Sequence, residues 1–252
     1  MLNQPIMDKL ATLKLGGMQE GLREQRESPH YNKLSFEERF GFLLDREWDE
    51  RQTRKLHRRM RMARFREQAV MEDMEISAKR GLDRKQVFYL AERTWIRNKL
   101  NTIITGPTGV GKTYLACALG NAACRKGYSV RYFQLSRLLG KLKLFLADGS
   151  YHKFLDQLAK TQLIIFDDWL RNLHTEAQTN DILEIMEDRY KHYPTLVATQ
   201  MPVEEWHGLL GNPTLADAIM DRLIHNAYRL ELEGESIRKR KSSLTHSGHL
   251  EV

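Results

Sequence analysis

The chain has 252 residues, of which 40 are Lys or Arg and 33 are Asp or Glu, so its net charge is +7. This length allows one sizeable α/β domain and a smaller one, and the positive charge favours a polyanionic partner, either nucleic acid or an anionic membrane surface. No apolar run reaches the ~20 residues that span a bilayer, and the first residues lack the apolar stretch of a signal peptide. Together with two cysteines spaced too widely for a disulfide, these features predict a cytoplasmic protein that does not enter a membrane.

Residues 1–92 are predicted to form a small all-helical domain that serves DNA binding and oligomerisation. A first helix is expected to be interrupted at Gly16-Gly17 and to resume at Met18. Ser35 followed three residues later by Glu38 is the pattern of a capping box, so a new helix is predicted to begin after Ser35.

Eight Lys or Arg residues and no acid occur between residues 51 and 66. A solvated surface helix normally mixes charges of both signs, because like charges one turn apart repel each other. We therefore interpret this stretch as a helix that contacts the phosphates of duplex DNA, and the near absence of aromatic residues argues against single-strand stacking. A merely solvated face and a calmodulin-like or membrane-surface helix are the open alternatives. The predicted DNA-binding residues are Arg51, Arg54, Lys55, Arg58, Arg59, Arg61 and Arg64.

The junction between the two domains is expected to be helical over residues 71–91, with a bend at Gly81. Four large apolar residues near this junction have two open interpretations. They either dock the N-terminal helices on the second domain or line an adenine pocket. These residues are Phe88, Tyr89, Leu90 and Trp95.

Residues 93–241 alternate predicted strands with predicted helices, a pattern typical of a parallel sheet covered on both faces. We expect an α/β fold with a central parallel five-stranded sheet. The strands are predicted at 100–105, 128–133, 163–166, 194–199 and 227–232, and the helices at 114–124, 135–146, 151–159, 179–190 and 215–225. Residues 242–252 form a polar tail that is expected to be disordered, as a cloning remnant would be.

The stretch GPTGVGKT at residues 106–113 matches G-x-x-x-x-G-K-[ST], the phosphate-binding loop of nucleoside triphosphatases. Its glycines allow consecutive N–H groups to curl around phosphate oxygens. Lys112 offers a positive charge to the β- and γ-phosphates, and Thr113 offers a hydroxyl to Mg²⁺. An ordinary glycine turn is the alternative, but the loop lies between a predicted strand and a predicted helix, as phosphate binding requires. The predicted ATP contacts are Gly106, Pro107, Thr108, Gly109, Val110, Gly111, Lys112, Thr113 and Tyr114.

Polar residues follow two of the later predicted strands. Asp167 and Asp168 end the apolar run LIIF, which is a Walker B pattern. Asp167 is predicted to hold Mg²⁺ together with Thr113, and Asp168 to orient or polarise the attacking water. Thr199 and Gln200 end the next strand, where they either position that water or form a simple polar strand end.

Two arginines near the C-terminal end are candidate phosphate contacts. Arg222 either points at the γ-phosphate of a neighbouring subunit, where it would stabilise developing charge, or forms a surface pair with Asp221. Arg238 is either a second phosphate sensor or part of a basic tail.

Four stretches together closely resemble the IstB-like helper ATPases of bacterial insertion sequences, which are related to the DnaC helicase loaders within the AAA+ initiator clade. These stretches are residues 106–113, LIIFDD at 163–168, the segment from 197 to 232, and GESIRKR at 234–240. The resemblance implies a Mg²⁺-dependent AAA+ ATPase that oligomerises as a ring or spiral with ATP at its subunit interfaces. It also implies that the oligomer binds and bends duplex target DNA and recruits and stimulates a partner transposase.

The same resemblance supports individual roles. It places Lys112 and Thr113 at the nucleotide, Asp167 at Mg²⁺ and Asp168 at the catalytic acid position, with Thr199 or Gln200 as first sensor and Arg222 as arginine finger. It also implies an additional DNA-facing helix over residues 135–146, so Lys141, Lys143 and Lys153 are further DNA-binding candidates. Most relatives carry Glu where Asp168 stands, and the loop 169–172 lacks an expected glycine.

Two other functions share the phosphate loop. A DnaC-like replicative helicase loader has the same ATPase core, so only the basic stretch favours DNA over a helicase surface. A small-molecule kinase would need an acceptor pocket and a lid, and neither is recognisable in the sequence.

Overall fold

The computed structural model describes residues 4–74, 80–92, 94–171 and 175–237. Its contacts divide the chain into two compact units, residues 1–58 and 59–252. This division falls earlier in the chain than the boundary predicted at residue 92. The reason is that the residues after Ala63 pack on the second unit, where the carbonyl of Ala69 accepts a hydrogen bond from Asn121 Nδ2 at 2.9 Å.

The first unit is helical, as predicted, and its helix ends follow local rules. The capping box is confirmed: Glu38 N donates to Ser35 Oγ at 3.2 Å, and Ser35 N donates to the Glu38 carboxylate at 2.8 Å. The first helix is interrupted, as expected, but the break lies at residues 13–15 rather than at Gly16-Gly17, and these two glycines are the first residues of the second helix. The elements are α1 (Gln4–Thr12), α2 (Gly16–Glu27), η1 (Pro29–Lys33) and α3 (Phe36–Ala63), which continues beyond the division between the units.

A buried carboxylate explains why α2 begins at the glycines. Glu47 is 6% exposed, and it accepts hydrogen bonds from Gly17 N at 2.8 Å and Met18 N at 3.3 Å. A Cβ on Gly17 would lie 2.6 Å from the backbone of α3, so only glycine allows this close approach. Burial alone would raise the pKa of Glu47, but the hydrogen bonds from Arg51, Met18 and Gly17 lower it below its ordinary value.

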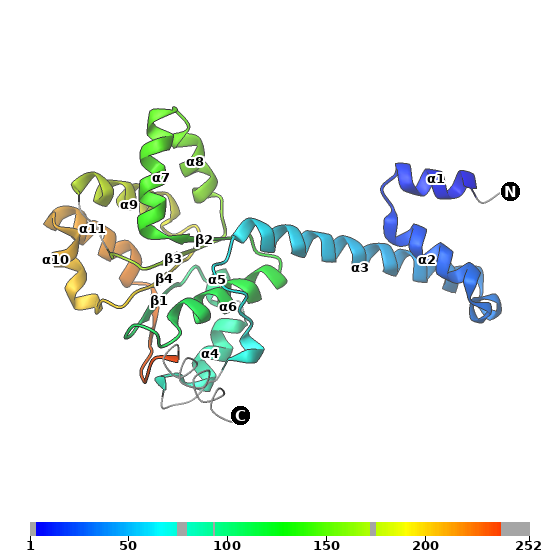
Figure 1. Cartoon of the computed structure of the whole chain (residues 1–252), viewed down its shortest axis with the longest axis horizontal. Coiled ribbons are helices and arrows are strands. Elements are labelled where there is room, and N and C mark those ends of the chain that lie inside the picture. The colour runs from blue at the N-terminus through cyan, green and yellow to red at the C-terminus, as the bar shows by residue number, and fades with distance from the viewer. Residues whose placement is uncertain (1–3, 75–79, 93, 172–174, 238–252) are drawn as a thin grey trace, which may run out of the picture. The chain divides into compact units, whose positions relative to one another are not determined.

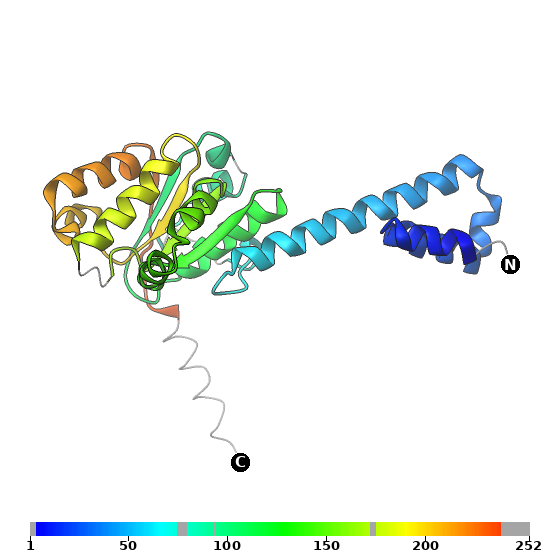
Figure 2. The same cartoon turned by 90° about the horizontal axis from the view of Figure 1, so that it is seen from above.

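The second unit contains the predicted five-stranded parallel sheet, with strand order β2-β3-β4-β1-β5 (Figures 1 and 2). Each strand pairs in parallel register with its neighbours; Gln134 lies opposite Asp167, and Phe166 lies opposite Val197. This order brings β3, β4 and β1 side by side at the centre. The strands are β1 (Asn101–Thr105), β2 (Val130–Gln134), β3 (Leu163–Asp167), β4 (Thr195–Ala198) and β5 (Ala227–Glu231).

Helices cover both faces of this sheet (Figure 2). Side chains alternate along a strand, so Ile164 and Phe166 of β3 join a core with α7 to α11 on one face, while Ile165 faces α6 on the other. The helices are α4 (Arg84–Ala91), α5 (Thr94–Arg97), α6 (Lys112–Arg125), α7 (Leu135–Ala147), α8 (Tyr151–Ala159), α9 (Glu176–Arg189), α10 (Trp206–Leu210) and α11 (Pro213–Ile224), with short 3₁₀ turns η2 (Met71–Asp73) and η4 (Val203–Glu205). Among the described residues, none of the helices is long and apolar enough to cross a membrane.

The apolar residues of the junction belong to the second unit. Trp95 is fully buried and donates to the carbonyl of Leu90 at 2.6 Å, and Tyr89 stacks on Tyr228 of β5 with ring centroids 5.4 Å apart. Phe88 is exposed. Tyr89 and Trp95 therefore pack α4 and α5 within the second unit, and both interpretations of the four residues stay predictions.

Candidate functional site

The phosphate loop leaves β1 and ends at α6, as its sequence predicts. Gly106 and Gly111 have φ angles of 140° and 99°, values that favour glycine. A Cβ on Gly106 would lie 2.2 Å from the carbonyl oxygen of Leu232, so the loop also passes close to the chain after β5. Gly111 is the N-cap of α6, and the first N–H groups of this helix therefore point toward the loop.

Lys112 and Thr113 carry the polar chemistry of the loop. The ammonium of Lys112 donates to the carbonyls of Gly106 and Pro107, each at 2.7 Å, so the side chain folds back over the loop. The hydroxyl of Thr113 donates to Asp167 Oδ2 at 2.8 Å. The two residues that were predicted to share Mg²⁺ are therefore in direct contact, and their oxygen atoms are ligands that suit this hard cation.

Asp167 is held from two sides at the end of β3. It is 2% exposed and accepts a second hydrogen bond from the hydroxyl of Tyr132, on the adjacent strand β2, at 2.6 Å. Burial and the Asp167 carboxylate raise the pKa of Tyr132, so its hydroxyl remains a proton donor. Tyr132 was not predicted as a site residue. A prediction of the strand order would have placed its strand, β2, beside the strand that ends at the Walker B acids.

Asp168 points into the same site from a different backbone conformation. Its φ angle is 54°, in the left-handed region that Asp tolerates better than most residues. Gln134 Nε2 donates to its carboxylate at 2.7 Å, and Arg171 Nη1 lies 3.6 Å from it. Two neighbours thus orient the carboxylate, and Gln134 is a further residue that sequence reasoning missed.

An arginine from the segment after α3 lies beside both acids. Arg66 Nη1 is 3.9 Å from Asp167 Oδ2 and 3.8 Å from Asp168 Oδ2. Burial lowers the pKa of Arg66, but Tyr132, Asp167 and Asp168 together raise it by more than burial lowers it, so the net shift of this pKa is upward. In the sequence Arg66 is only the last charge of a basic stretch. Nothing local separates it from the other seven.

Thr199 and Gln200 follow β4 and have different contacts. Thr199 is 1% exposed, and its hydroxyl donates to the carbonyl of Trp169 at 2.9 Å, so it braces the loop after Asp168. Gln200 Oε1 accepts a hydrogen bond from the Thr108 hydroxyl at 2.5 Å and therefore contacts the phosphate loop directly. Between the two predicted sensor positions, Gln200 is the one whose side chain reaches the phosphate loop.

These groups line one pocket at the carboxyl edge of the sheet, the edge where open α/β folds bind ligands. Ile237 also lines it, and its N–H donates to the carbonyl of Gly109 at 3.0 Å; Arg238, the next residue, lies outside the described part of the chain. Val110 is buried, and Gly106 and Pro107 border an adjacent hollow. The predicted residues in the pocket are Thr108, Gly109, Gly111, Lys112, Thr113, Tyr114, Asp167, Asp168, Thr199 and Gln200, joined by Arg66, Gln134 and Arg171.

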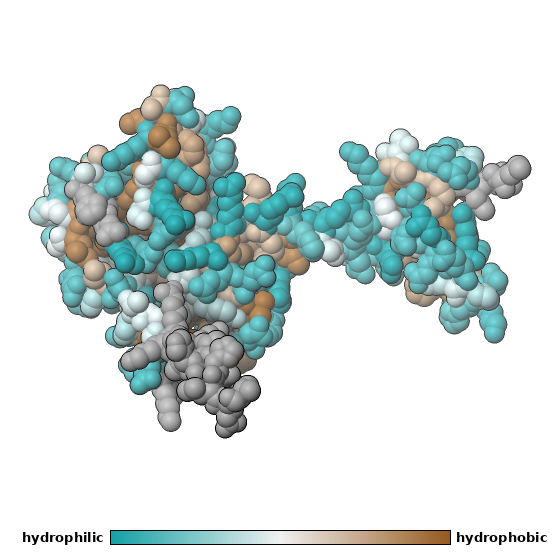
Figure 3. Space-filling view, in the orientation of Figure 1, coloured by the Kyte–Doolittle hydropathy of each residue, from teal (hydrophilic) through white to brown (hydrophobic). Residues whose placement is uncertain are grey.

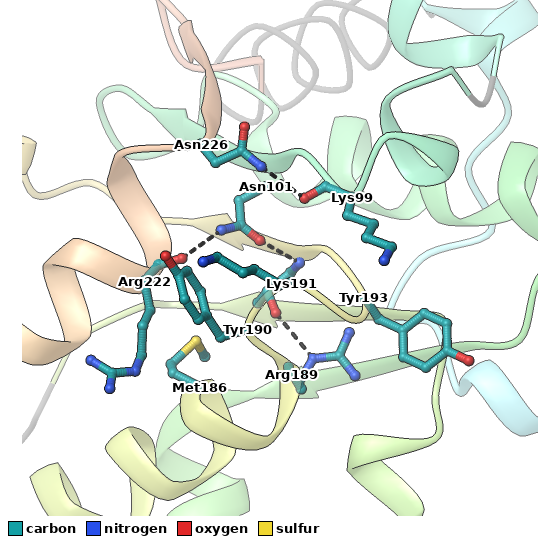
Figure 4. Close-up of a pocket in the computed structure, with 10 residues that line it drawn as sticks. Lys99, Asn101, Met186, Arg189, Tyr190, Lys191, Tyr193, Arg222 and Asn226 are labelled. Atoms are coloured by element: carbon teal, nitrogen blue, oxygen red, sulfur yellow. Dashed lines mark hydrogen bonds between the residues drawn. The ribbon is translucent and has the colours of Figure 1, made fainter.

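Arg222 lies at the opposite, amino edge of the sheet, beside the starts of β1, β4 and β5 (Figure 4). Its Nη1 donates to the carbonyl of Ala218 at 2.8 Å, and its Nη2 pairs with the carboxylate of Glu187 on α9. The predicted alternative of a pair with Asp221 is not observed, because Asp221 lies 3.3 Å from His225 instead. Arg222 is therefore remote from the nucleotide pocket of its own chain.

A family model described as "IstB-like ATP binding protein" matches residues 8–245, which is most of the chain. The chain belongs to this family. The resemblance to IstB-like proteins and the AAA+ P-loop fold are thereby confirmed, and the description of the family supports ATP binding.

Relatives and solved structures agree with this assignment. The IstB-family chain is 46% identical over 239 residues to "Putative insertion sequence ATP-binding protein y4pL" of Sinorhizobium fredii, covering 95% of this chain and 98% of that protein. It is 42% identical over 203 residues to "Insertion sequence IS1162 putative ATP-binding protein" of Pseudomonas fluorescens, covering 80% of this chain and 88% of that protein. Among solved structures, DnaI matches with a TM-score of 0.58 at 22% identity, covering 66% of this chain and 92% of that one. AMPPCP-bound DnaA of Aquifex aeolicus matches with a TM-score of 0.57 at 20% identity, covering 75% of this chain and 58% of that one. At these identities both likenesses concern the fold alone.

The predicted DNA-binding residues are mostly exposed, and hydrophilic residues predominate on the face of α3 that Figure 3 shows. Arg51 pairs with Glu47 at 2.6 Å and Arg54 with Glu50 at 3.1 Å. In the described part of the chain no ion pair is recorded for Lys55, Arg58, Arg59, Arg61 or Arg64. Lys141 and Lys143 on α7 and Lys153 on α8 are exposed, and α7 is the helix expected after β2.

Proposed function

We propose that this IstB-family chain hydrolyses ATP with Mg²⁺ and that ATP at its subunit interfaces assembles it on duplex target DNA, which it bends while recruiting and stimulating a partner transposase. The observation that carries the ATPase part is the hydrogen bond between Thr113 and Asp167 beside Lys112, in a pocket that also holds Asp168. A phosphate-binding loop, a pair of oxygen ligands and an oriented acid are the components that phosphoryl transfer to water needs.

Each residue of the pocket has a distinct task in this proposal. Thr113 and Asp167 would hold Mg²⁺, which when bound neutralises negative charge on the β- and γ-phosphates. Lys112 exchanges its two loop carbonyls for phosphate oxygens. Asp168, oriented by Gln134, accepts a hydrogen bond from the attacking water and polarises it, and Gln200 places a polar group at the γ-phosphate side of the loop.

The position of Arg222 supports a site completed by a second subunit. A finger that acts in trans has to lie away from the nucleotide of its own chain, and Arg222 lies at the opposite edge of the sheet. Its partner Glu187 is 55% exposed, so the ion pair is accessible to exchange for a phosphate. Arg222→Ala should lower turnover by about 10³-fold or more, and mixing it with Lys112→Ala should restore activity at mixed interfaces. Failure of the mixture to recover any activity would argue against a shared site.

The case for DNA as the partner rests on the basic residues and on the relatives. Arg58, Arg59 and Arg61 have no recorded ion pair in the described residues, so phosphates of a duplex are suitable counterions. The relatives are ATP-binding proteins of insertion sequences, which makes the transposase of such an element the expected protein partner. Lys141, Lys143 and Lys153 form a second candidate contact on the ATPase unit.

Binding of labelled duplex, measured with ATP, with ADP and without nucleotide at about 50 and 200 mM salt, tests this proposal. We expect binding to require ATP and to weaken at least a hundredfold (~10²) between these salt concentrations, through counterion release. Replacing Arg58, Arg59 and Arg61 by Ala should reduce the salt slope by about 3 and leave ATP affinity intact. A matched variant that replaces three exposed basic residues elsewhere by Ala should change neither the salt slope nor the ATP affinity. These residues are Arg97, Lys126 and Lys160. DNA binding that does not depend on salt and does not require ATP would contradict the proposal.

A helicase loader is the alternative function, because DnaI and the DnaC helicase loader share the fold, the latter with a TM-score of 0.56. The shared core does not separate the two functions. A pull-down that offers a replicative helicase and a transposase in equal amounts does so: stable capture of the helicase alone would favour the loader.

A further inference from the structure

Arg66 occupies a place in the ATP pocket that neither the phosphate loop nor the Walker B strand accounts for. It is the one residue of the segment after α3 whose charged group is recorded beside Asp167 and Asp168 in the described structure. Its side chain is 46% exposed and lines the pocket, so the guanidinium faces the space that phosphates would enter rather than a packed core.

The backbone that carries Arg66 is anchored to the helix of the phosphate loop. The ring of Phe65 packs over Gly120 of α6, where a Cβ would come within 2.5 Å of it, so glycine is required at this position. Asn121 of α6 donates to the carbonyl of Ala69 at 2.9 Å, and the Tyr114 hydroxyl donates to that of Val70 at 3.4 Å. Because α6 begins at Lys112, the anchor places Arg66 at a constant distance from the phosphate loop.

The side chain, in contrast, makes no short contact with either acid, and Tyr132 is its other polar neighbour. Arg66 Nη1 lies 3.9 Å from Asp167 Oδ2 and 3.8 Å from Asp168 Oδ2. These ion pairs lack the short, linear geometry of a bidentate arginine–carboxylate pair. A planar guanidinium with five donors binds phosphate oxygens at least as well as carboxylates. Nucleotide phosphates would enter beside Asp167, and the terminal phosphate would offer Arg66 a new anion. Asp167 would then be left, with Thr113, to hold Mg²⁺.

We propose that Arg66 is a γ-phosphate sensor supplied by the same chain, which exchanges the Asp167 and Asp168 carboxylates for the terminal phosphate of bound ATP. This assignment rests on the proposed function and names how the site distinguishes ATP from ADP. Arg66 lies three residues after the end of α3, and Arg59, Arg61 and Arg64 of the same unit are DNA-binding candidates. A change in the contacts of Arg66 on binding the γ-phosphate would therefore occur close to the basic C-terminal end of α3.

The test compares ATP and ADP affinity of the full chain by calorimetry or with fluorescent nucleotides. Arg66→Ala should lower the ratio of ATP to ADP affinity by about tenfold or more, because it removes a charge-assisted contact to a group that ADP lacks. Arg66→Lys, which retains the charge but loses the planar fork, should give an intermediate ratio. An equal loss for both nucleotides, or an unchanged ratio, would overturn the proposal and leave Arg66 as a structural partner of the acids.

Arg125→Ala is the matched control. Arg125 pairs with Glu72 at 2.9 Å and holds the same segment against α6, but it lies outside the pocket. It should leave the ATP-to-ADP ratio unchanged, and a loss equal to that of Arg66→Ala would show that docking of the segment, rather than the guanidinium, controls the ratio. A wild-type chain that binds nucleotides but does not hydrolyse ATP would contradict the proposed function while leaving this ratio measurable.

Discussion

Two buried charges of the ATPase unit, Asp167 and Arg189, have opposite kinds of surroundings. Each is 2% exposed. The side chains that contact Asp167 are Thr113, Tyr132 and Arg66, whose hydroxyl and guanidinium groups can rotate to other acceptors, and one backbone group, Asp168 N, donates to its Oδ1 at 3.0 Å. Arg189 instead donates to the carbonyls of Leu158, Thr161 and Pro194 and to the Thr195 hydroxyl, and the three carbonyls belong to the fixed backbone.

The difference distinguishes a site from a structural clamp. Burial lowers the pKa of Arg189 to about 9, which leaves it charged at neutral pH, and its carbonyl partners tie the ends of α8 and α9 to the start of β4. A charge with fixed backbone partners stabilises one conformation. A charge whose side-chain partners can rotate away is able to accept another ligand in their place, which for the carboxylate of Asp167, in the pocket at the phosphate loop, would be a metal ion.

The largest expected effect concerns the exchangeable site. In the proposed mechanism the charge of Asp168 polarises the attacking water. Asp168→Asn removes this charge but retains the side-chain volume and an oxygen that Gln134 can contact. We expect kcat for ATP hydrolysis to fall by about 10²- to 10⁴-fold with ATP affinity and the free energy of unfolding nearly unchanged. Steady-state turnover and calorimetric ATP binding measure the two effects. An unchanged rate would remove Asp168 from the mechanism.

Arg189→Met tests the clamp. The substitution leaves buried carbonyls without a donor, so we expect the free energy of unfolding to fall by about 3 kcal/mol or more, measured by urea titration. At temperatures where the variant is folded, its affinity for ATP should match that of the wild type. Arg125→Ala, which breaks an exposed ion pair, should cost at most about 1 kcal/mol. A clamp variant with wild-type stability would remove the distinction between the two charges.

The smallest effect concerns Glu47, a buried charge of the first unit with backbone N–H partners. Because its pKa is lowered below the ordinary value of 4.5, the stabilisation is complete above pH 4.5 and is lost as pH falls through the folded-state pKa. Hydrogen exchange of the α2 amides in the full chain should therefore show weaker protection below this pH. Glu47→Gln should flatten this dependence, whereas Glu20→Gln, at an exposed ion pair, should leave it as in the wild type.

Much of the ATP site was predictable because its determinants are local. The phosphate loop depends on glycines at set positions, and the Walker B strand depends on four apolar residues followed by acids. The capping box at Ser35 was predictable for the same reason, since both of its partners lie within one helical turn. By contrast, no local pattern predicts that the second helix begins at Gly16, because that start depends on Glu47, 30 positions away from Gly17.

The alternation of strands and helices, the phosphate loop and the acids that end β3 are predictable from short stretches of sequence, since each is encoded within a few neighbouring residues. Which distant side chains meet these residues depends on the folded chain. The parallel pairing of β2 with β3 brings Tyr132 and Gln134 to the acids, and the packing of Phe65 on Gly120 brings Arg66 to them. Such contacts depend on strand order and on helix packing, and no local pattern reports either.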